Sequence, residues 1–578
     1  MVNEGESTVL NIALESSIEN LDEVVVTAEA IKSGEAGLLS IQRKAIAVQD
    51  GISAEELSKS TDGNVGSAMK RVSGVSVVGG RDVYVRGLGN RYSNVQLNGS
   101  PIPSTNPNKK EAPVDILSSG IVDNIVVQKT YTPDQSGEFS GGSVQIITKE
   151  FPNDPSITFS YTSEINSNST FKNYLGYNGG GTDFLGFDNG FRNLPTDLED
   201  SEITNTQEAG RIVTDLNNSW ASKNIQSLPS QKLGFSYSNQ FNLVSNISYK
   251  YATSSRTNET FRYINNYNEN SGEILLGSDY IRNSGEESTG INGMLNVFVK
   301  PNDFTKIGLK NLYSNSSTNQ FSTIEGSYYN FDNDNRQTVA EFDRRAIYSS
   351  TLIYETYFQN FMESSLDASL TYSKAVRDLP DRRTTQYVRN DAGNLEVILP
   401  FRGNSHFFSF QNDNNYSAKL DYDFKPVKRL RVKVGGFGMY KDREFESYKL
   451  IYEANPSSNA PDIDKSLSPE EIFTAENILN ESLLLTERTS SRDSYNGEQE
   501  LAAGYFSLNW SPTSKWNVVT GLRTEQSTQS INNKALVSEL DLLPAFNTTY
   551  RPSNKTNLRG AFSITLARPE FRELSEFN

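Results

Sequence analysis

Residues 420–434 read LDYDFKPVKRLRVKV, and this stretch decides the fold class. Apolar and charged side chains alternate on both sides of residues 425–428, which contain Pro426. Alternation places one kind of side chain on each face of a strand, and a short break with proline joins two antiparallel strands. The stretch therefore predicts a β-hairpin with one apolar face. The apolar positions are Leu420, Tyr422, Phe424, Leu430, Val432 and Val434.

Four further hairpins repeat this pattern, and long polar segments separate them. The sequence therefore predicts short turns at one end of the strands and long loops at the other, which is typical of an outer-membrane β-barrel. A soluble β-sandwich more often has modest connections at both ends. The predicted turns are 300–303, 359–360, 511–514 and 551–554, and the predicted loops are 166–231, 256–287, 317–345, 377–414 and 443–499.

The alternation rule gives about 13 candidate strands between residues 156 and 567. An odd number does not close in the usual bacterial pattern, and a plugged barrel has about 22 strands, so we expect the sequence to lack its C-terminal strands. Aromatic residues near the predicted strand ends would form interfacial girdles in a barrel, or core in a sandwich. They are Tyr249, Tyr251, Tyr372, Tyr440, Trp510 and Trp516.

Composition excludes several classes of protein. The net charge of -17 disfavours nucleic acid as a partner, because phosphates are bound by surplus Lys and Arg. The absence of Cys excludes thiol chemistry, and the single histidine, His406 in a loop-like stretch, makes a hydrolase triad or a histidine metal site a poor fit. No run of 18 apolar residues occurs, so any membrane crossing must use strands. We expect any export signal to lie upstream of Met1.

The first 150 residues have a different pattern. The β-prone run at residues 21–28 fits either strand addition to a partner's sheet or a strand packed inside this chain. Thr61 and Asn64 precede a helical pattern that ends at Gly74. Strands follow at 75–78, 82–87, 125–127 and 144–147, with a helical turn at 113–120, so the sequence predicts a small α+β module.

Two local motifs have simple interpretations. Residues 86–91 superficially suggest a phosphate-binding glycine loop, but the lysine and the helix of a nucleotide site are missing, so tight turns explain the glycines better. Ser468, Pro469 and Glu471 predict a capped helix inside a long loop, with an apolar face at Ile472, Phe473 and Ile478. That helix would order its loop or cover the barrel mouth.

Several blocks resemble TonB-dependent outer-membrane receptors, in particular a Bacteroidetes-type branch whose plug follows a carboxypeptidase-regulatory-like domain. The blocks are residues 83–92, 97–99, 101–104, 132–134, 141–149, 183–190, 468–473 and 567–571. The resemblance implies a mainly β protein: the end of that extra domain at 1–20, a TonB-box tether and linker at 21–50, a small α+β plug domain at 51–152, and an incomplete, large antiparallel transmembrane β-barrel at 153–578.

The resemblance also implies two sets of site residues. The TonB box, which a TonB-type energy-transducing protein binds, would be Glu23, Val24, Val25, Val26, Thr27 and Ala28. The plug motif, with a structural or gating role, would be Arg86, Gly87, Gly89, Arg91, Asn98, Gly99, Gly141 and Gly142.

The implied function is active import of a scarce solute, of the siderophore, glycan or peptide class, across the outer membrane of a Gram-negative bacterium, with the plug gating the barrel. No catalysis, cofactor or metal is expected. The expected partners are the TonB-type protein, outer-membrane lipid, the imported solute and, where one is encoded alongside, a surface lipoprotein. The alternative is a passive porin or a surface adhesin with an N-terminal soluble domain.

Overall fold

The computed structural model describes residues 34–575, except 46, 61, 151–154, 197, 199–202, 240–242, 269–272, 329–332, 391, 400–402, 490–492 and 554–555. The predicted TonB box at residues 23–28 therefore lies outside the described residues. The described chain forms a small α+β unit, referred to below as the plug, and one large antiparallel sheet. Among the described residues, no helix has the length and apolar character that crossing a bilayer requires.

The plug has a five-stranded sheet in the order β1-β6-β7-β4-β5. Asn64 caps α4 by accepting a hydrogen bond from the Ser67 backbone N–H at 2.8 Å, which confirms the predicted helix start. The predicted hairpin and the last two predicted strands are also present. The elements are α2 (Glu35–Lys44), β1 (Gln49–Ser53), α3 (Ala54–Lys59), α4 (Val65–Met69), β2 (Val75–Val78), β3 (Asp82–Val85), η1 (Asn90–Tyr92), β4 (Ser93–Leu97), β5 (Ser100–Pro101), η2 (Ser119–Ile121), β6 (Val122–Gln128) and β7 (Gly142–Thr148).

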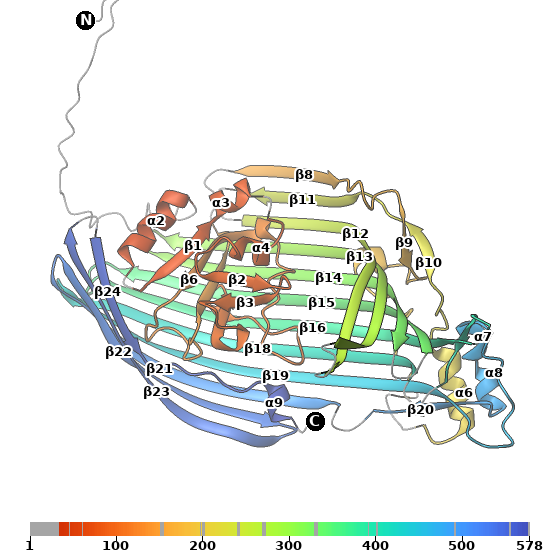
Figure 1. Ribbon diagram of the computed structural model, residues 1–578. Helices are drawn as coiled ribbons and strands as arrows, with labels where there is room; N and C mark the ends of the chain where they lie inside the picture. The colour runs from red at the N-terminus through yellow and green to blue at the C-terminus, as the bar shows by residue number, and fades with distance from the viewer. Residues whose placement is uncertain are drawn as a thin grey trace, which may run out of the picture.

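The large sheet follows a path of thirteen strands from β8 to β24, which confirms the predicted count. It curves round the plug, which lies on its concave side (Figure 1). The short strands β17 (Leu395–Val397) and β20 (Leu483–Glu487) extend it at β16 and β19. The thirteen are β8 (Ser156–Glu164), β11 (Ser230–Ser238), β12 (Leu243–Asn268), β13 (Glu273–Asn302), β14 (Thr305–Tyr328), β15 (Asn333–Phe358), β16 (Ser364–Arg389), β18 (Asn404–Val427), β19 (Leu430–Ala454), β21 (Tyr495–Thr513), β22 (Trp516–Ile531), β23 (Lys534–Ser553) and β24 (Thr556–Ser563).

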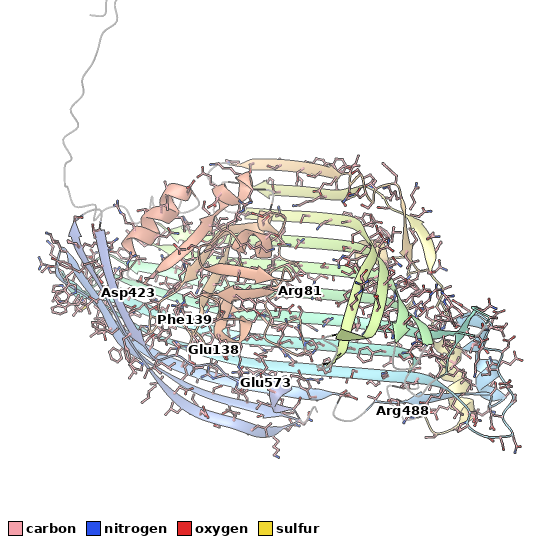
Figure 2. The ribbon with its side chains drawn as sticks, in the orientation of Figure 1. Arg81, Glu138, Phe139, Asp423, Arg488 and Glu573 are labelled. Carbon is pink, nitrogen blue, oxygen red and sulfur yellow. The ribbon has the colours of Figure 1, made fainter. Side chains whose placement is uncertain are left out.

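The two ends of this sheet differ, as predicted. At the turn end, strands are joined by short segments such as 303–304, 428–429 and 514–515. At the loop end, long segments at 165–229 and 455–494 carry elements of their own. Figure 2 places Asp423 near the turn end and Arg488 near the loop end, with Arg81 and Glu138 of the plug between them.

Most of the predicted loop lengths are wrong. Residues 256–268 and 273–287 belong to β12 and β13, and residues 317–345 belong to β14 and β15 apart from 329–332, which lie outside the described residues. Their polar residues form strands because the backbone ladder to both neighbours continues. A strand needs about 10 residues to cross a bilayer, whereas β19 has 25 residues, so more than half of it lies beyond the membrane.

The outward face of the sheet carries an apolar band with aromatic edges. Tyr372, Tyr416 and Tyr440 lie side by side on adjacent strands, with ring centroids 5.0 and 6.4 Å apart. Trp510, 51% exposed, pairs with Leu430, ten residues before Tyr440 on β19. About ten residues is the span that a tilted strand needs to cross a bilayer. Four of the predicted girdle residues therefore mark the band, although Tyr372 and Tyr440 lie in mid-strand rather than near strand ends; the four are Tyr372, Tyr440, Trp510 and Trp516.

Beyond the tyrosines, a collar covers part of the outward face. It consists of residues 165–229 and 455–489, with β9 (Asn173–Gly176), η3 (Asp183–Leu185), α6 (Thr206–Asp215), β10 (Lys223–Gln226), α7 (Pro469–Ile472) and α8 (Ala475–Leu479). Arg192 is fully buried, lies 4.5 Å over the Phe342 ring, and pairs with Asp183 at 2.7 Å and Asp188 at 2.8 Å. The predicted capping box of Ser468 and Glu471 is confirmed, and it begins α7.

His406 lies within β18 rather than in the loop-like stretch that we expected. Asn404, at the start of β18, connects this strand to β16 where a loop was predicted. Its side-chain oxygen accepts a hydrogen bond from the Gln386 N–H at 2.8 Å, and its side-chain amide donates to the Ile398 carbonyl at 2.6 Å. The His406 ring is buried against Trp220 of the collar, and its Nδ1 lies 2.5 Å from Asp381 Oδ1. Its described contacts are those of a packed residue.

Candidate functional site

The apolar core of the plug continues into the wall of the sheet. Four buried side chains from β12, β13, β14 and β15 belong to the same cluster as the plug's own core. Alternation explains their position, because inward-facing residues of these strands meet the apolar edge of the plug. These strands are called the anchored wall below. The four residues are Val244, Met294, Leu312 and Ile347.

Ion pairs reinforce the same contact. Glu150, just after the plug's last strand, pairs with Lys306 of β14 at 3.0 Å and with Lys310 of the same strand. Asp115 of the plug pairs with Arg345 of β15 at 2.7 Å. Burial by itself would raise the pKa of Glu150, but the two lysines lower it to about 2. The plug is therefore held to the anchored wall by apolar and charged contacts together.

This pairing predicts how docking depends on pH. A carboxyl whose pKa is lowered in the docked state stabilises that state fully above its ordinary pKa, and the contribution is lost as pH falls through the lowered value. We expect plug docking to be unchanged from pH 7 to pH 5 and to weaken between about pH 4 and pH 2. Hydrogen exchange of residues 142–150 measures it, and Glu150→Gln should remove most of the dependence. Loss of protection centred near pH 6 would contradict this assignment.

A second contact fixes the plug segment 131–141 to β22. The Glu525 carboxylate is fully buried and accepts hydrogen bonds from the Gly137 backbone N–H at 3.0 Å and from Arg523 at 2.6 Å. Arg568, from the segment after β24, pairs with the same carboxylate at 2.9 Å. In return, the Leu566 N–H donates to the Gly137 carbonyl at 2.9 Å. We call this group the Glu525 latch, and the predicted plug motif did not include it.

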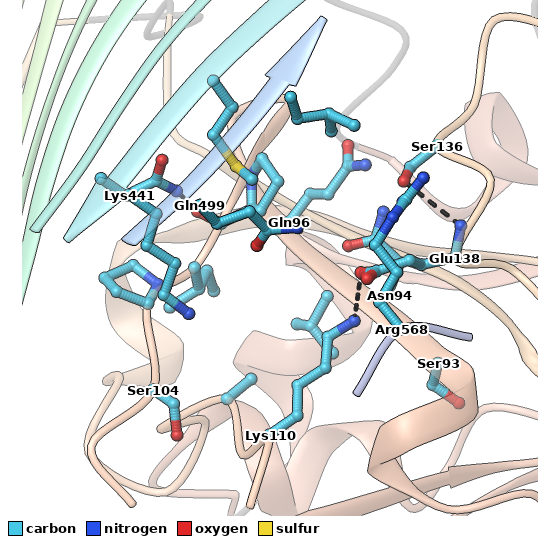
Figure 3. A pocket seen from close by; sticks show the side chains of 18 of the residues that line it. Ser93, Asn94, Gln96, Ser104, Lys110, Ser136, Glu138, Lys441, Gln499 and Arg568 are labelled. Atoms are coloured by element: carbon cyan, nitrogen blue, oxygen red, sulfur yellow. Dashed lines mark hydrogen bonds and ion pairs between the residues drawn. The ribbon is translucent and has the colours of Figure 1, made fainter. Parts of the chain in front are cut away.

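A polar cavity of about 130 Å³ lies between the plug and strands β18 to β22. Figure 3 shows side chains from plug, wall and the segment after β24 pointing into it. Ser93 Oγ, Asn415 Oδ1 and Gln529 Oε1 are buried in its lining and accept no hydrogen bond from another described residue. Buried polar groups of this kind are normally satisfied by water, for which this volume suffices.

Most of the predicted plug-motif residues hold the plug's loops to one another, whereas Arg91 contacts the segment after β24. Arg86 donates to the Gly141 carbonyl at 2.9 Å, and a Cβ on Gly141 would lie only 2.8 Å from Ser93 Oγ. Asn98 accepts a hydrogen bond from the Thr148 N–H at 3.1 Å. Arg91 pairs with Glu573 at 2.6 Å. Gly87 and Gly99 lie in turns, Gly89 packs against the Tyr84 ring, and Gly142 begins β7.

A mouth pocket lies on the inner face near the loop end. Tyr280 and Arg282 face inward because the β13–β14 ladder is unbroken from Ser278 to Val299 and Met294 of that strand packs into the plug. None of the described lining residues carries a carboxylate. Sequence reasoning missed this pocket because residues 256–287 were predicted to be a loop. The lining includes Phe261, Tyr263, Tyr280, Arg282, Ile324, Asn335, Gln337 and Gln386.

The sheet has an apolar outward band between two aromatic edges, a polar inner face, and a plug on its concave side. Together these features define the class of outer-membrane β-barrel proteins. Residues 41–144 match the family model described as TonB-dependent Receptor Plug Domain, and residues 295–578 match TonB dependent receptor-like, beta-barrel. The chain belongs to the TonB-dependent receptors of the Gram-negative outer membrane. These are receptors and transporters, which confirms that the chain is not an enzyme.

Solved structures share this fold at low identity. The pyoverdine outer membrane receptor FpvA from Pseudomonas aeruginosa PAO1, bound to pyoverdine, has a TM-score of 0.50 and 12% identity, over 90% of this chain and 62% of that one. The siderophore receptor PiuA from Acinetobacter baumannii has a TM-score of 0.43 and 12% identity, over 88% and 63%. The chain thus spans less than two thirds of these structures. No curated protein matches its sequence.

Proposed function

We propose that the complete protein imports a scarce solute across the outer membrane, driven by a TonB-type partner, with the plug as the gate. The observation that carries the proposal is the position of the plug, whose core is shared with the wall. The passive-porin alternative is disfavoured because a docked plug occupies the concave side of the sheet. The surface-adhesin alternative requires an independent N-terminal domain, and it is disfavoured because the plug shares its apolar core with the wall.

The position of the first described residues supports a pull by a partner in the periplasm. Arg551 and Arg559, at the turn end of β23 and β24, donate to the Arg43 and Ala45 carbonyls at 3.5 and 3.3 Å. The described part of the proposed tether and linker, which includes Arg43 and Ala45, therefore lies at the turn end. Turns of outer-membrane barrels face the periplasm, where the energy-transducing partner is expected.

The first plug strand is suited to yielding under such a pull. Among the described strands, β1 lies at the edge of the plug sheet and pairs with β6 alone, over five residues. A force on the tether loads this ladder from its end, so its hydrogen bonds break one after another. The TonB box pairs with the partner's sheet edge-on, so several bonds share the load there. We propose that the pairing of the TonB box with its partner holds while the plug yields. The proposed units are the tether and linker, residues 21–50, whose last part forms α2 and the start of β1, then the plug, residues 51–152, and the barrel, residues 153–578.

The mouth pocket is the proposed site of solute capture. Its tyrosines offer flat apolar faces, its amides offer donors and acceptors, and Arg282 offers a guanidinium for carboxylate or phenolate groups. A metal-chelating siderophore has all three features. Pyoverdine is therefore a reasonable first probe, since the receptor of similar fold was solved with it bound.

Energised uptake tests the proposal. Cells that express the complete protein are given pyoverdine loaded with radioactive iron, and a panel of other ferric siderophores, with and without a protonophore. We expect accumulation that stops when the proton gradient collapses and is absent from a strain without the TonB-type partner. Accumulation that persists with the protonophore would instead establish a passive pore.

A further inference from the structure

The two described parts of the wall hold the plug in different ways. On the anchored wall, Met294 and Ile347 are 4% and 1% exposed and pack into the plug core, and the Glu150 and Asp115 ion pairs lie beside them. Separating this contact would expose apolar surface at about 25 cal/mol per Å² and leave buried charges without partners. The anchored wall is therefore the stronger contact.

On strands β18 to β22, by contrast, the plug is held around the polar cavity by single hydrogen bonds and by an ion pair between Asp134 and Lys433 of β19, at 3.1 Å. The Ser100 and Ser417 hydroxyls lie 2.7 Å apart, and the Asn415 amide donates to the Pro101 carbonyl at 3.1 Å. Water replaces such bonds at a net cost of only about 1 kcal/mol each. Asn94, Gln96 and Gln499 line the cavity with amide groups that water would solvate as the cavity widens, so widening it adds little desolvation cost.

The Glu525 latch and the ion pair between Asp134 of the plug and Lys433 of β19, at 3.1 Å, both border the cavity. Asp134, Gln135, Ser136 and Glu138, which flank Gly137, all line the cavity. Release of Gly137 from Glu525 and of Asp134 from Lys433 would therefore move one boundary of the cavity and leave the anchored wall in place. The Glu525 latch is thus positioned to keep the cavity between the plug and strands β18 to β22 closed.

We infer that the solute passes through the cavity between the plug and strands β18 to β22, while the plug stays on the anchored wall. This inference rests on the proposed function and specifies its route. The lining is rich in amides, hydroxyls and paired charges, including Asn94, Gln96, Gln499 and the Lys110–Glu138 pair. Such a lining suits a solute with many hydrogen-bonding groups.

Two matched disulfide staples test the route, and the absence of native Cys leaves the background clean. The cavity staple is Ser100→Cys with Ser417→Cys. The control staple is Thr148→Cys with Asn296→Cys on the anchored wall, where the side-chain atoms lie 3.4 Å apart. The complete protein, in a planar bilayer, is treated with urea to loosen the plug. The readout is KCl current before and after reduction, and thiol titration verifies each bond.

We expect the oxidised cavity staple to lower the urea-induced current by about tenfold or more, because each 1.4 kcal/mol added to opening lowers the open fraction tenfold. The control staple should leave the current unchanged, and reduction should restore it. Equal currents with both staples, or block by the control staple alone or by both, would overturn the route. If the cavity variant fails to fold, Ser140→Cys with Thr565→Cys, 3.3 Å apart, replaces it.

Failure of the route and failure of the proposed function are separable. The same variants are assayed for energised uptake in cells, with the ferric siderophore that the wild type accumulates. If neither oxidised staple reduces protonophore-sensitive uptake, the import function stands and the route is wrong. If the reduced variants and the wild type show no energised uptake at all, the proposed function itself fails.

Discussion

Deletion of residues 23–28 from the complete protein is expected to abolish energised uptake and to leave solute binding at the cell surface unchanged. The reason is mechanical. The outer membrane offers no nucleotide as an energy source, so work reaches the plug only through the tether. Without a strand for the partner to pair with, no force reaches β1, and the space between the plug and strands β18 to β22 stays closed.

The matched control removes residues 2–7, which shortens the chain equally and leaves the proposed TonB box intact. Initial rates of uptake and equilibrium binding are measured on the same cells with the same ferric siderophore. We expect uptake to fall to the level of the protonophore-treated wild type in the first variant alone. Undiminished uptake after deletion of residues 23–28 would mean that the tether does not transmit the force.

Glu525→Ala is expected to loosen the plug without any pull. The change leaves the buried Arg523 guanidinium, the Arg568 guanidinium and the Gly137 N–H without their shared acceptor. Removing one partner from a buried ion pair costs about 3–5 kcal/mol, which raises the undocked fraction of segment 131–141 by a factor of roughly 10² to 4 × 10³.

The measurement is spontaneous KCl current through the complete protein in a bilayer, without denaturant. We expect frequent openings in Glu525→Ala and fewer in Glu525→Gln, which keeps an acceptor but not the charge. Glu500→Ala, on the exposed outward face of β21, is the matched control and should remain closed. A closed Glu525→Ala protein with normal hydrogen-exchange protection at residues 131–141 would show that the latch does not hold the plug.

The hairpin at residues 420–434 shows what alternation predicts well. Its apolar and charged residues separate onto the two faces of β18 and β19, as in the other predicted hairpins. The number of strands could be predicted from the sequence because each membrane-crossing strand faces lipid on one side and the plug or water on the other. The same requirement for an apolar face applies to every membrane-crossing strand, so the alternating pattern recurs along the chain.

Beyond the row of Tyr372, Tyr416 and Tyr440, the strands no longer face lipid, so an apolar outward face is no longer required. On β14 and β15, residues 317–327 and 335–345 face water or the collar on one side and the aqueous interior on the other, so their polar sequence led to the prediction of a loop. Only the hydrogen-bonded ladder shows that they are strands. The mouth pocket and the collar contacts of His406 were missed for this reason.

The contacts that hold the plug could not be predicted from local sequence. Gly137 and Glu525 are 388 residues apart, and nothing near either residue indicates the other. Most plug-motif residues, by contrast, act within the plug, as between Arg86 and Gly141, so their blocks are recognisable in the sequence. Arg91 differs, because it pairs with Glu573, after β24. Short-range constraints leave a pattern in the sequence, whereas pairing across the lumen depends on the folded barrel.

The central claim is that the plug lies inside a lipid-embedded cylinder, fixed to one part of its wall. Electron cryo-microscopy of the complete protein in lipid nanodiscs tests this most directly. We expect residues 62–150 within the lumen, Met294 and Ile347 against the plug core, and Tyr372, Tyr416 and Tyr440 at the edge of the lipid. A map with those residues outside the cylinder, or with the strands stacked as two water-exposed sheets, would contradict it.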